Sequence, residues 1–367
     1  MDECESMTEE CPFEQDVIPQ QEVLNQASGE NWTLFRGDCI ETLQGLPDES
    51  IGYSVFSPPF SQLYTFTNSD RDLSNSSSDE EFWTHYGFLA VQLYRVLQQG
   101  RLVSVHMMNM PSTKQWQGYI GIRDFRGDCI RAMASAGFIY HSEVAIWKDP
   151  VTAMQRTKAL GLLHKQLVKD STMSRQGIAD YIVNFAKPRK DGLTVDPNID
   201  GDIASNLMRM FADIWEEVMP QSLITFRKPG TNKAPVHGKL DHFAGDPETF
   251  RHDGDMSIDI WQRYASPVWT DIRQSNTLQY QMARDNSDER HISPLQLDVI
   301  ERCIQLWTNP GDVVLSPFAG IGSEGFQSIL MERKFIGVEI KESYFRWACD
   351  YLRKAESIQR QKSRMLF

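Results

Sequence analysis

Stretches typical of strands and of helices alternate along most of this 367-residue chain, and this alternation constrains the fold more than any other feature. Residues 51–56 have the apolar run of a buried strand, and residues 79–97 have apolar side chains at helical spacing. The pattern returns late in the chain, where a helix from Ser323 precedes a strand at residues 335–338. Strands alternating with helices predict a doubly wound, mostly parallel α/β sheet.

The same pattern divides the chain into four parts. Residues 1–30 lack hydrophobic periodicity and are expected to form an acidic, flexible leader. Residues 31–187 and 291–367 carry the strand and helix alternation and are expected to be two halves of one domain. Residues 188–290 contain Gly, Pro and Trp with weak periodicity, which indicates an inserted or separate module.

Composition excludes several classes of protein. Hydrophobic residues make up 41% of the chain, and no apolar run approaches the length of a membrane span. The N-terminal residues have neither the basic nor the apolar region of a secretory signal. The six cysteines form no C-x-x-C pair, which argues against a disulfide framework and against a metal site. We therefore expect a cytoplasmic protein with reduced thiols, no metal and no membrane partner.

The net charge of −13 is unevenly distributed. Residues 1–35 hold nine acidic side chains and no basic one, whereas residues 148–190 hold nine Lys and Arg against three Asp. Such a basic run is typical of a solvated face and is also compatible with a groove for a polyanion. The overall acidity therefore does not exclude a nucleic-acid partner.

A glycine-rich turn at residues 316–325 indicates a cofactor site. Gly320 and Gly322 let the backbone bend tightly before a helix whose amide groups point towards a ligand. Glu339 ends the next strand, where a carboxylate accepts hydrogen bonds from the ribose hydroxyls of an adenosine cofactor. With Gly325 the turn also spells G-x-G-x-x-G, so a nicotinamide cofactor is an alternative. Only one strand and one helix follow, too few to complete a dinucleotide-binding fold.

A second motif, Ser57-Pro58-Pro59-Phe60, follows the strand at residues 51–56. Ligands bind at the carboxyl ends of strands in open α/β sheets. The two prolines fix the backbone, so that a carbonyl and the Ser57 hydroxyl can accept both protons of one amino group. Phe60 can stack on a base removed from its duplex. His106, at another strand end, is either a neighbour of this pocket or a core residue.

Together the two motifs resemble the S-adenosylmethionine-dependent DNA amino-methyltransferases of the permuted beta class, in which the S/D/N-P-P-F/Y motif precedes the F-x-G-x-G motif. The resemblance implies a Rossmann-like methyltransferase fold with S-adenosylmethionine as cofactor. It assigns catalysis to Ser57, Pro58, Pro59 and Phe60. Ser316 departs from the family, which usually has Asp there. The implied cofactor-binding residues are Asp38, Cys39, Ser316, Phe318, Ala319, Gly320, Gly322, Ser323 and Glu339.

The resemblance also implies double-stranded DNA as the substrate, with target recognition by residues 188–290. Ser57 favours the N4 amino group of cytosine, because the family commonly has Asp or Asn there when adenine N6 is methylated. Parts of the sequence resemble methylases of bacteriophages, which implies a bacterial host cytoplasm, and a homodimer is compatible with the sequence. The basic side chains expected to contact DNA are Arg156, Lys158, Lys165, Lys169, Arg175, Arg227 and Lys228.

Two other functions are compatible with parts of the sequence. A nicotinamide-dependent oxidoreductase would use the G-x-G-x-x-G turn, and a catalytically inactive DNA-binding protein would keep the fold alone. Binding of S-adenosylmethionine but not of NAD, followed by methyl transfer to DNA, distinguishes a methyltransferase from both.

Overall fold

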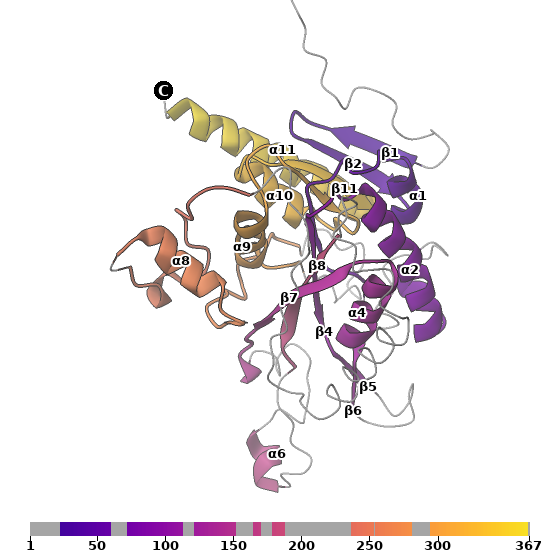
Figure 1. The fold of residues 1–367 in the computed structure, drawn as a ribbon, viewed down its shortest axis with the longest axis horizontal. Helices are drawn as coiled ribbons and strands as arrows, with labels where there is room; N and C mark the ends of the chain where they lie inside the picture. The colour runs from indigo at the N-terminus through magenta and orange to yellow at the C-terminus, as the bar shows by residue number, and fades with distance from the viewer. Residues whose placement is uncertain are drawn as a thin grey trace, which may run out of the picture.

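A nine-stranded sheet in the order β1-β2-β11-β10-β3-β4-β8-β7-β9 is the centre of the molecule (Figure 1). The computed structural model describes residues 23–59, 72–112, 121–151, 164–169, 178–187, 236–252, 254–280 and 294–365. The strands of this sheet are β1 (Val23–Ser28), β2 (Trp32–Gly37), β3 (Tyr53–Phe56), β4 (Leu102–Met108), β7 (Ile139–Ile146), β8 (Asp180–Ala186), β9 (Val268–Trp269), β10 (Val313–Ser316) and β11 (Lys334–Glu339). A separate antiparallel pair consists of β5 (Met110–Ser112) and β6 (Gly121–Arg123).

The sheet is mixed but mostly parallel. The neighbours β2, β11, β10, β3 and β4 all run in the same direction. Strand β8 is antiparallel to both of its neighbours, β4 and β7. Because β8 runs backwards, its first residues lie at the same edge of the sheet as the last residues of β4. The predicted α/β class is confirmed.

Helices cover both faces of the sheet (Figure 1). The described helices are α1 (Cys39–Gln44), α2 (Asp79–Val96), α4 (Phe125–Ser135), α6 (His164–Lys169), α8 (Met256–Tyr264), α9 (Leu297–Trp307), α10 (Ser323–Leu330) and α11 (Glu342–Met365), with short 3-10 turns at η1 (Leu73–Asn75) and η4 (Pro247–Thr249). Alternate residues of β3 belong to opposite cores: Val55 packs with the cluster that contains α9, α10 and α11, and Phe56 packs with the cluster that contains α1, α2 and α4. This is the doubly wound arrangement expected from the sequence.

Two strands of the main sheet lie outside the two segments, 31–187 and 291–367, that were expected to carry its strands. Strand β1 falls within residues 1–30, so the last part of the expected leader is an edge strand paired with β2. Strand β9 falls within residues 188–290 and pairs in parallel with β7, so this region contributes to the same sheet. Both strands are short or polar, and edge strands of this kind leave little hydrophobic pattern.

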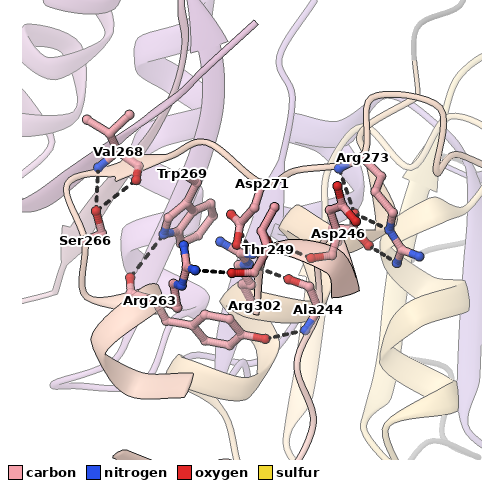
Figure 2. A network of polar contacts seen from close by, with 12 residues as sticks. Ala244, Asp246, Thr249, Arg263, Ser266, Val268, Trp269, Asp271, Arg273 and Arg302 are labelled. Carbon is pink, nitrogen blue, oxygen red and sulfur yellow. Dashed lines mark hydrogen bonds and ion pairs between the residues drawn. The ribbon is translucent and has the colours of Figure 1, made fainter. Parts of the chain in front are cut away.

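A buried arginine ties the segment that contains α8 and β9 to the main sheet. Arg302 of α9 is fully buried, and its Nη2 atom lies 2.9 Å from Oδ1 of Asp271. Its Nε atom donates to the carbonyl of Ala244 at 2.6 Å, as Figure 2 shows. The guanidinium also lies 4.7 Å from the ring centre of Tyr264 and 5.0 Å from that of Trp269. A buried charge with this many partners fixes α8 and β9 against α9.

Four of the six cysteines are in the described part of the chain: Cys39, Cys129, Cys303 and Cys349 are buried free thiols. None of the described helices combines the length and the apolar character needed to span a bilayer.

Candidate active site

The carboxyl edge of the sheet brings the two motifs together. Strand β10 pairs in parallel with β3, so the glycine turn after Ser316 and the Ser57 motif leave neighbouring strands at the same edge. Strand β4 follows as the next neighbour and carries His106 near its end. This edge is the position at which open α/β sheets bind their ligands.

The glycine turn has the backbone that its sequence predicts. Gly320 has φ +53° and Gly322 has φ +88°, values at which other residues are strained. A Cβ atom on Gly320 would meet no heavy atom within 4 Å, so the space beside it is open. A Cβ on Gly322 would lie 3.2 Å from the Ala348 backbone of α11, so this glycine is also needed for packing. Among the described residues, no side chain caps the amide groups at the start of α10.

Glu339 links the end of β11 to this turn. Its Oε2 atom accepts a hydrogen bond from the Gly320 amide at 2.8 Å, and its Oε1 atom accepts one from the Lys341 amide at 2.8 Å. Burial raises the pKa of this carboxyl to about 7, although the two backbone bonds oppose the shift, and the charge of Asp72 raises the pKa further. The carboxylate therefore holds the glycine turn against the end of β11.

Several other polar groups are buried around the turn. The hydroxyls of Ser316 and Ser323 are buried and have no hydrogen-bond partner among the described residues. Glu324 is also buried, and its pKa is raised to about 8, first by burial and then by the charge of Glu339. Buried polar atoms are normally hydrogen-bonded, so this group of side chains is suited to a polar ligand.

The remaining predicted cofactor residues lie in the turn itself or directly after β2, the parallel neighbour of β11. The Ala319 amide donates to the Val338 carbonyl at 2.8 Å, and the ring of Phe318 lies 5.7 Å from that of Phe56 at the end of β3. Asp38 caps α1 through Oδ1, which accepts from the Ile40 and Glu41 amides. Cys39 is buried beside it, and burial raises the pKa of its thiol well above the ordinary value.

Ser57 begins a chain of polar contacts across the sheet. Its Oγ atom lies 2.8 Å from Nδ1 of His106. The other ring nitrogen, Nε2, lies 3.2 Å from Oδ2 of Asp180, the first residue of β8. The second oxygen of Asp180, Oδ1, lies 2.5 Å from Nζ of Lys148, just after β7. Four neighbouring strands, β3, β4, β8 and β7, therefore position one side chain each, in sheet order.

Asp180 and Lys148 were not among the predicted site residues. Their contact with His106 depends on the reversed direction of β8. In this pairing, Asp180 lies opposite Met108 of β4 on one side and opposite Ile146 of β7 on the other. The one local signal was the charge of Asp180 at the start of a mostly apolar strand. Pro58 is buried and Pro59 is half-buried, whereas Phe60 lies outside the described residues.

Two of the seven predicted DNA-contacting residues can be located. Lys165 and Lys169 lie on α6, and both are exposed. The remaining five lie outside the described residues: Arg156, Lys158, Arg175, Arg227 and Lys228.

Comparison with known proteins identifies a family. Residues 53–350 match the family model described as DNA methylase, whose members are N6 and N4 methyltransferases. The chain is 37% identical over 310 residues to the Type II methyltransferase M.BamHI of Bacillus amyloliquefaciens, an alignment that covers 84% of this chain and 54% of M.BamHI. The chain thus spans about half the length of that relative. It is 29% identical over 125 residues, or 34% of this chain and 36% of the relative, to the DNA adenine methyltransferase YhdJ of Escherichia coli K12.

Two solved structures share the fold. The cytosine-N4-specific PvuII DNA methyltransferase superimposes with a TM-score of 0.52 at 15% identity, over 93% of this chain and 96% of that one. A DNA modification methylase of Thermus thermophilus, solved with S-adenosyl-L-methionine, superimposes with a TM-score of 0.54 at 17% identity, over 88% of this chain and 93% of that one.

Proposed function

This chain belongs to the N6/N4 DNA methylase family, and on that premise we propose that it transfers a methyl group to the N4 amino group of cytosine in double-stranded DNA. The observation that carries the proposal is the pairing of β10 with β3, because the glycine turn and the Ser57 motif follow these two neighbouring strands. A donor bound at the turn and a base held at Ser57 are then neighbours, which is the arrangement that a direct transfer needs.

S-adenosylmethionine is the methyl donor of this family, and the described residues fit it. Gly320 leaves open space at the turn, and the buried hydroxyls of Ser316 and Ser323 can pair with the polar methionine part. Glu339 can accept hydrogen bonds from the ribose. Asp38 lies after β2, the parallel neighbour of β11, where it can reach the adenine. When bound, the cofactor supplies an electrophilic methyl group on a sulfonium ion.

Ser57 supports cytosine as the target. Its hydroxyl can accept one amino proton, while the backbone carbonyl of the following proline turn accepts the other, and this localises the nitrogen lone pair towards the methyl group. PvuII methyltransferase, which shares the fold, acts on cytosine N4, whereas YhdJ, a sequence relative, acts on adenine. Methylation of adenine N6 is therefore the alternative, and the serine is the residue that favours cytosine.

We infer that the chain has the permuted, beta-class order, because the Ser57 motif precedes the glycine turn by more than half of the sequence. Residues 188–290 are proposed to recognise the target sequence. The exposed side chains of Lys165 and Lys169 are proposed to contact phosphates, together with the other predicted basic residues. The bacterial cytoplasm is the proposed place of action, and the resemblance to phage methylases is the reason to propose a phage origin.

Nucleoside mass spectrometry of DNA methylated in vitro tests this proposal. N4-methylcytosine as the product supports it, and N6-methyladenine as the sole product overturns the choice of base. Ser57→Ala should bind S-adenosylmethionine as tightly as the wild type yet lose most of its turnover, because the variant removes a contact to the base and none to the cofactor. Near-normal turnover would make Ser57 a turn residue.

A further inference from the structure

We propose that His106, Asp180 and Lys148 form a proton relay that orients the Ser57 hydroxyl and carries a proton away from the target amino group. The relay rests on the proposed function, since it acts on the substrate of that reaction. It gives a role to a histidine, an aspartate and a lysine that neither of the two sequence motifs contains.

The contacts define which atom carries each proton. Burial alone would raise the pKa of Asp180, but its contacts with His106 and Lys148 hold the pKa below its ordinary value, so Asp180 is an ionised carboxylate. An ionised carboxylate only accepts, so the Nε2 atom of His106, 3.2 Å away, carries the ring proton. Nδ1 is then unprotonated and accepts the Ser57 O–H at 2.8 Å.

This assignment determines what Ser57 can do for the base. Because its own proton points to His106, the lone pairs of its oxygen are available to accept an N–H of the amino group. The opposite ring tautomer would donate to Ser57 and turn the hydroxyl proton towards the base, where it would repel the amino protons. Lys148 and Asp180 therefore select the productive orientation of Ser57 through the histidine.

The same contacts provide a path for the proton that methylation releases. The amino nitrogen forms its bond to the methyl carbon as the bond from that carbon to sulfur breaks, and the nitrogen then holds one proton too many. That proton passes to Oγ of Ser57 while the Ser57 proton passes to Nδ1 of His106. Asp180 stabilises the resulting imidazolium, which returns its proton to water after the product leaves.

Stability alone does not account for these four side chains. The side chains of Asp180 and His106 are 6% and 12% exposed, and burying charged groups costs more free energy than packing apolar side chains of similar volume. Nε2 of His106 is buried and makes no hydrogen bond of standard geometry with the described residues, and the group that faces it is Oδ2 of Asp180 at 3.2 Å. Within the described residues, the titratable group that contacts His106 is Asp180 of β8, and the one that contacts Asp180 in turn is Lys148, just after β7.

The decisive variant is His106→Asn, whose amide oxygen can replace Nδ1 as acceptor for Ser57 but cannot take up its proton. In single-turnover assays with bound S-adenosylmethionine and DNA, it should slow methyl transfer by about 100-fold or more. The acid limb of the pH–rate profile should disappear, and both binding constants should stay within about twofold of wild type. Asp180→Asn should slow transfer to a similar extent, because an amide beside Nε2 favours the wrong tautomer.

His141→Asn is the matched control, since Nδ1 of His141 also lies near a serine hydroxyl, 3.0 Å from Ser142. This control should transfer methyl groups at the wild-type rate. His106→Ala provides a second test: added imidazole should restore part of its rate in proportion to the imidazole concentration.

Two results overturn the relay alone. The first is a His106→Asn variant that transfers methyl groups within about twofold of the wild-type rate. The second is a slow His106→Asn variant that keeps the acid limb of the pH–rate profile, together with a His106→Ala variant whose rate does not increase with added imidazole. A wild-type protein that methylates no base overturns the proposed function, and the relay with it.

Discussion

The carboxylate of Glu339, at the end of β11, accepts the backbone amide of Gly320 in the turn after β10, at 2.8 Å. One side chain thus joins two segments that are proposed to bind the cofactor and that the sequence separates by 19 residues. The proposed ribose site and the glycine turn are therefore coupled: a change at Glu339 should alter the shape of the turn as well as the proposed contacts to the ribose.

Replacing Glu339 should weaken the binding of S-adenosylmethionine. Glu339→Ala removes charge-assisted hydrogen bonds of about 1.5–3 kcal/mol, so the dissociation constant should rise about tenfold or more. Isothermal titration calorimetry measures this change. Glu342→Ala is the control, because its carboxylate is exposed and pairs with Arg36 and Arg346 instead. Unchanged affinity in a folded Glu339→Ala variant would refute the ribose assignment.

Cofactor binding should depend on pH through the same carboxyl. Burial raises the pKa of Glu339 to about 7, so the group is mostly protonated at lower pH and mostly ionised at higher pH. The ionised form is the better acceptor for ribose hydroxyls, so affinity should increase as pH rises through this pKa. Glu339→Gln, which cannot ionise, should remove this dependence. An equal pH dependence in both proteins would point to another group.

Glu324 should make the folded state less stable at alkaline pH. Burial raises its pKa from 4.5 to about 8, so between these values the folded protein holds a proton that the unfolded chain releases. Stability therefore falls as pH rises through this interval, and the loss is complete above the folded-state pKa. Glu324→Gln should raise the melting temperature at pH above 8 and should change it little near pH 4.5. Calorimetric melting across this range tests the sign, which a pH-independent difference would contradict.

Removing the buried arginine should destabilise the protein strongly. Arg302→Met leaves Asp271 buried without its cation, and breaking a buried pair in this way costs about 3–5 kcal/mol. Urea unfolding followed by tryptophan fluorescence reports the change, since Trp269 packs on the guanidinium. Arg353→Met, which breaks an exposed pair with Asp350, should change stability by less than about 1 kcal/mol. Similar losses of stability in the two variants would show that the buried ion pair of Arg302 contributes no more to the free energy of unfolding than the exposed pair of Arg353.

The lysines of α6 should contribute to DNA binding without sequence preference. Lys165→Ala and Lys169→Ala should each lower the slope of log affinity against log salt by about one unit and weaken all DNA sequences alike. Arg131→Ala, an exposed residue of α4 paired with Asp128, is the control. Fluorescence anisotropy over a series of salt concentrations gives the slopes. A variant that changes sequence preference at constant slope would assign its lysine to base recognition.

Local patterns were sufficient to predict the core strands and the helices around the two motifs. The strand before Ser57 and the turn at Gly320 both follow from apolar runs that end at glycine or proline. The strands β1 and β9 were missed because they are edge strands with few buried residues, whose position depends on a partner strand rather than on their own pattern.

The candidate site could be predicted only in part, for a related reason. Ser57 and Glu339 belong to motifs in which the chemistry and the sequence spacing coincide. Asp180 and Lys148 meet His106 only through the antiparallel pairing of β8 with β4 and β7. These strands are far apart in the sequence, so no local spacing of residues predicts the contact between them.

The position of β10 and β11 has a consequence for synthesis of the chain on the ribosome. These two strands lie between β2 and β3, although they are translated more than 250 residues later, roughly the whole length of a domain. Until they emerge, the nascent polypeptide lacks the middle of its sheet, and neither the glycine turn nor the neighbour of the Ser57 strand exists. Such long-range pairing slows folding, and an interrupted translation product is expected to lack the pair of motifs on which the proposed methyl transfer depends.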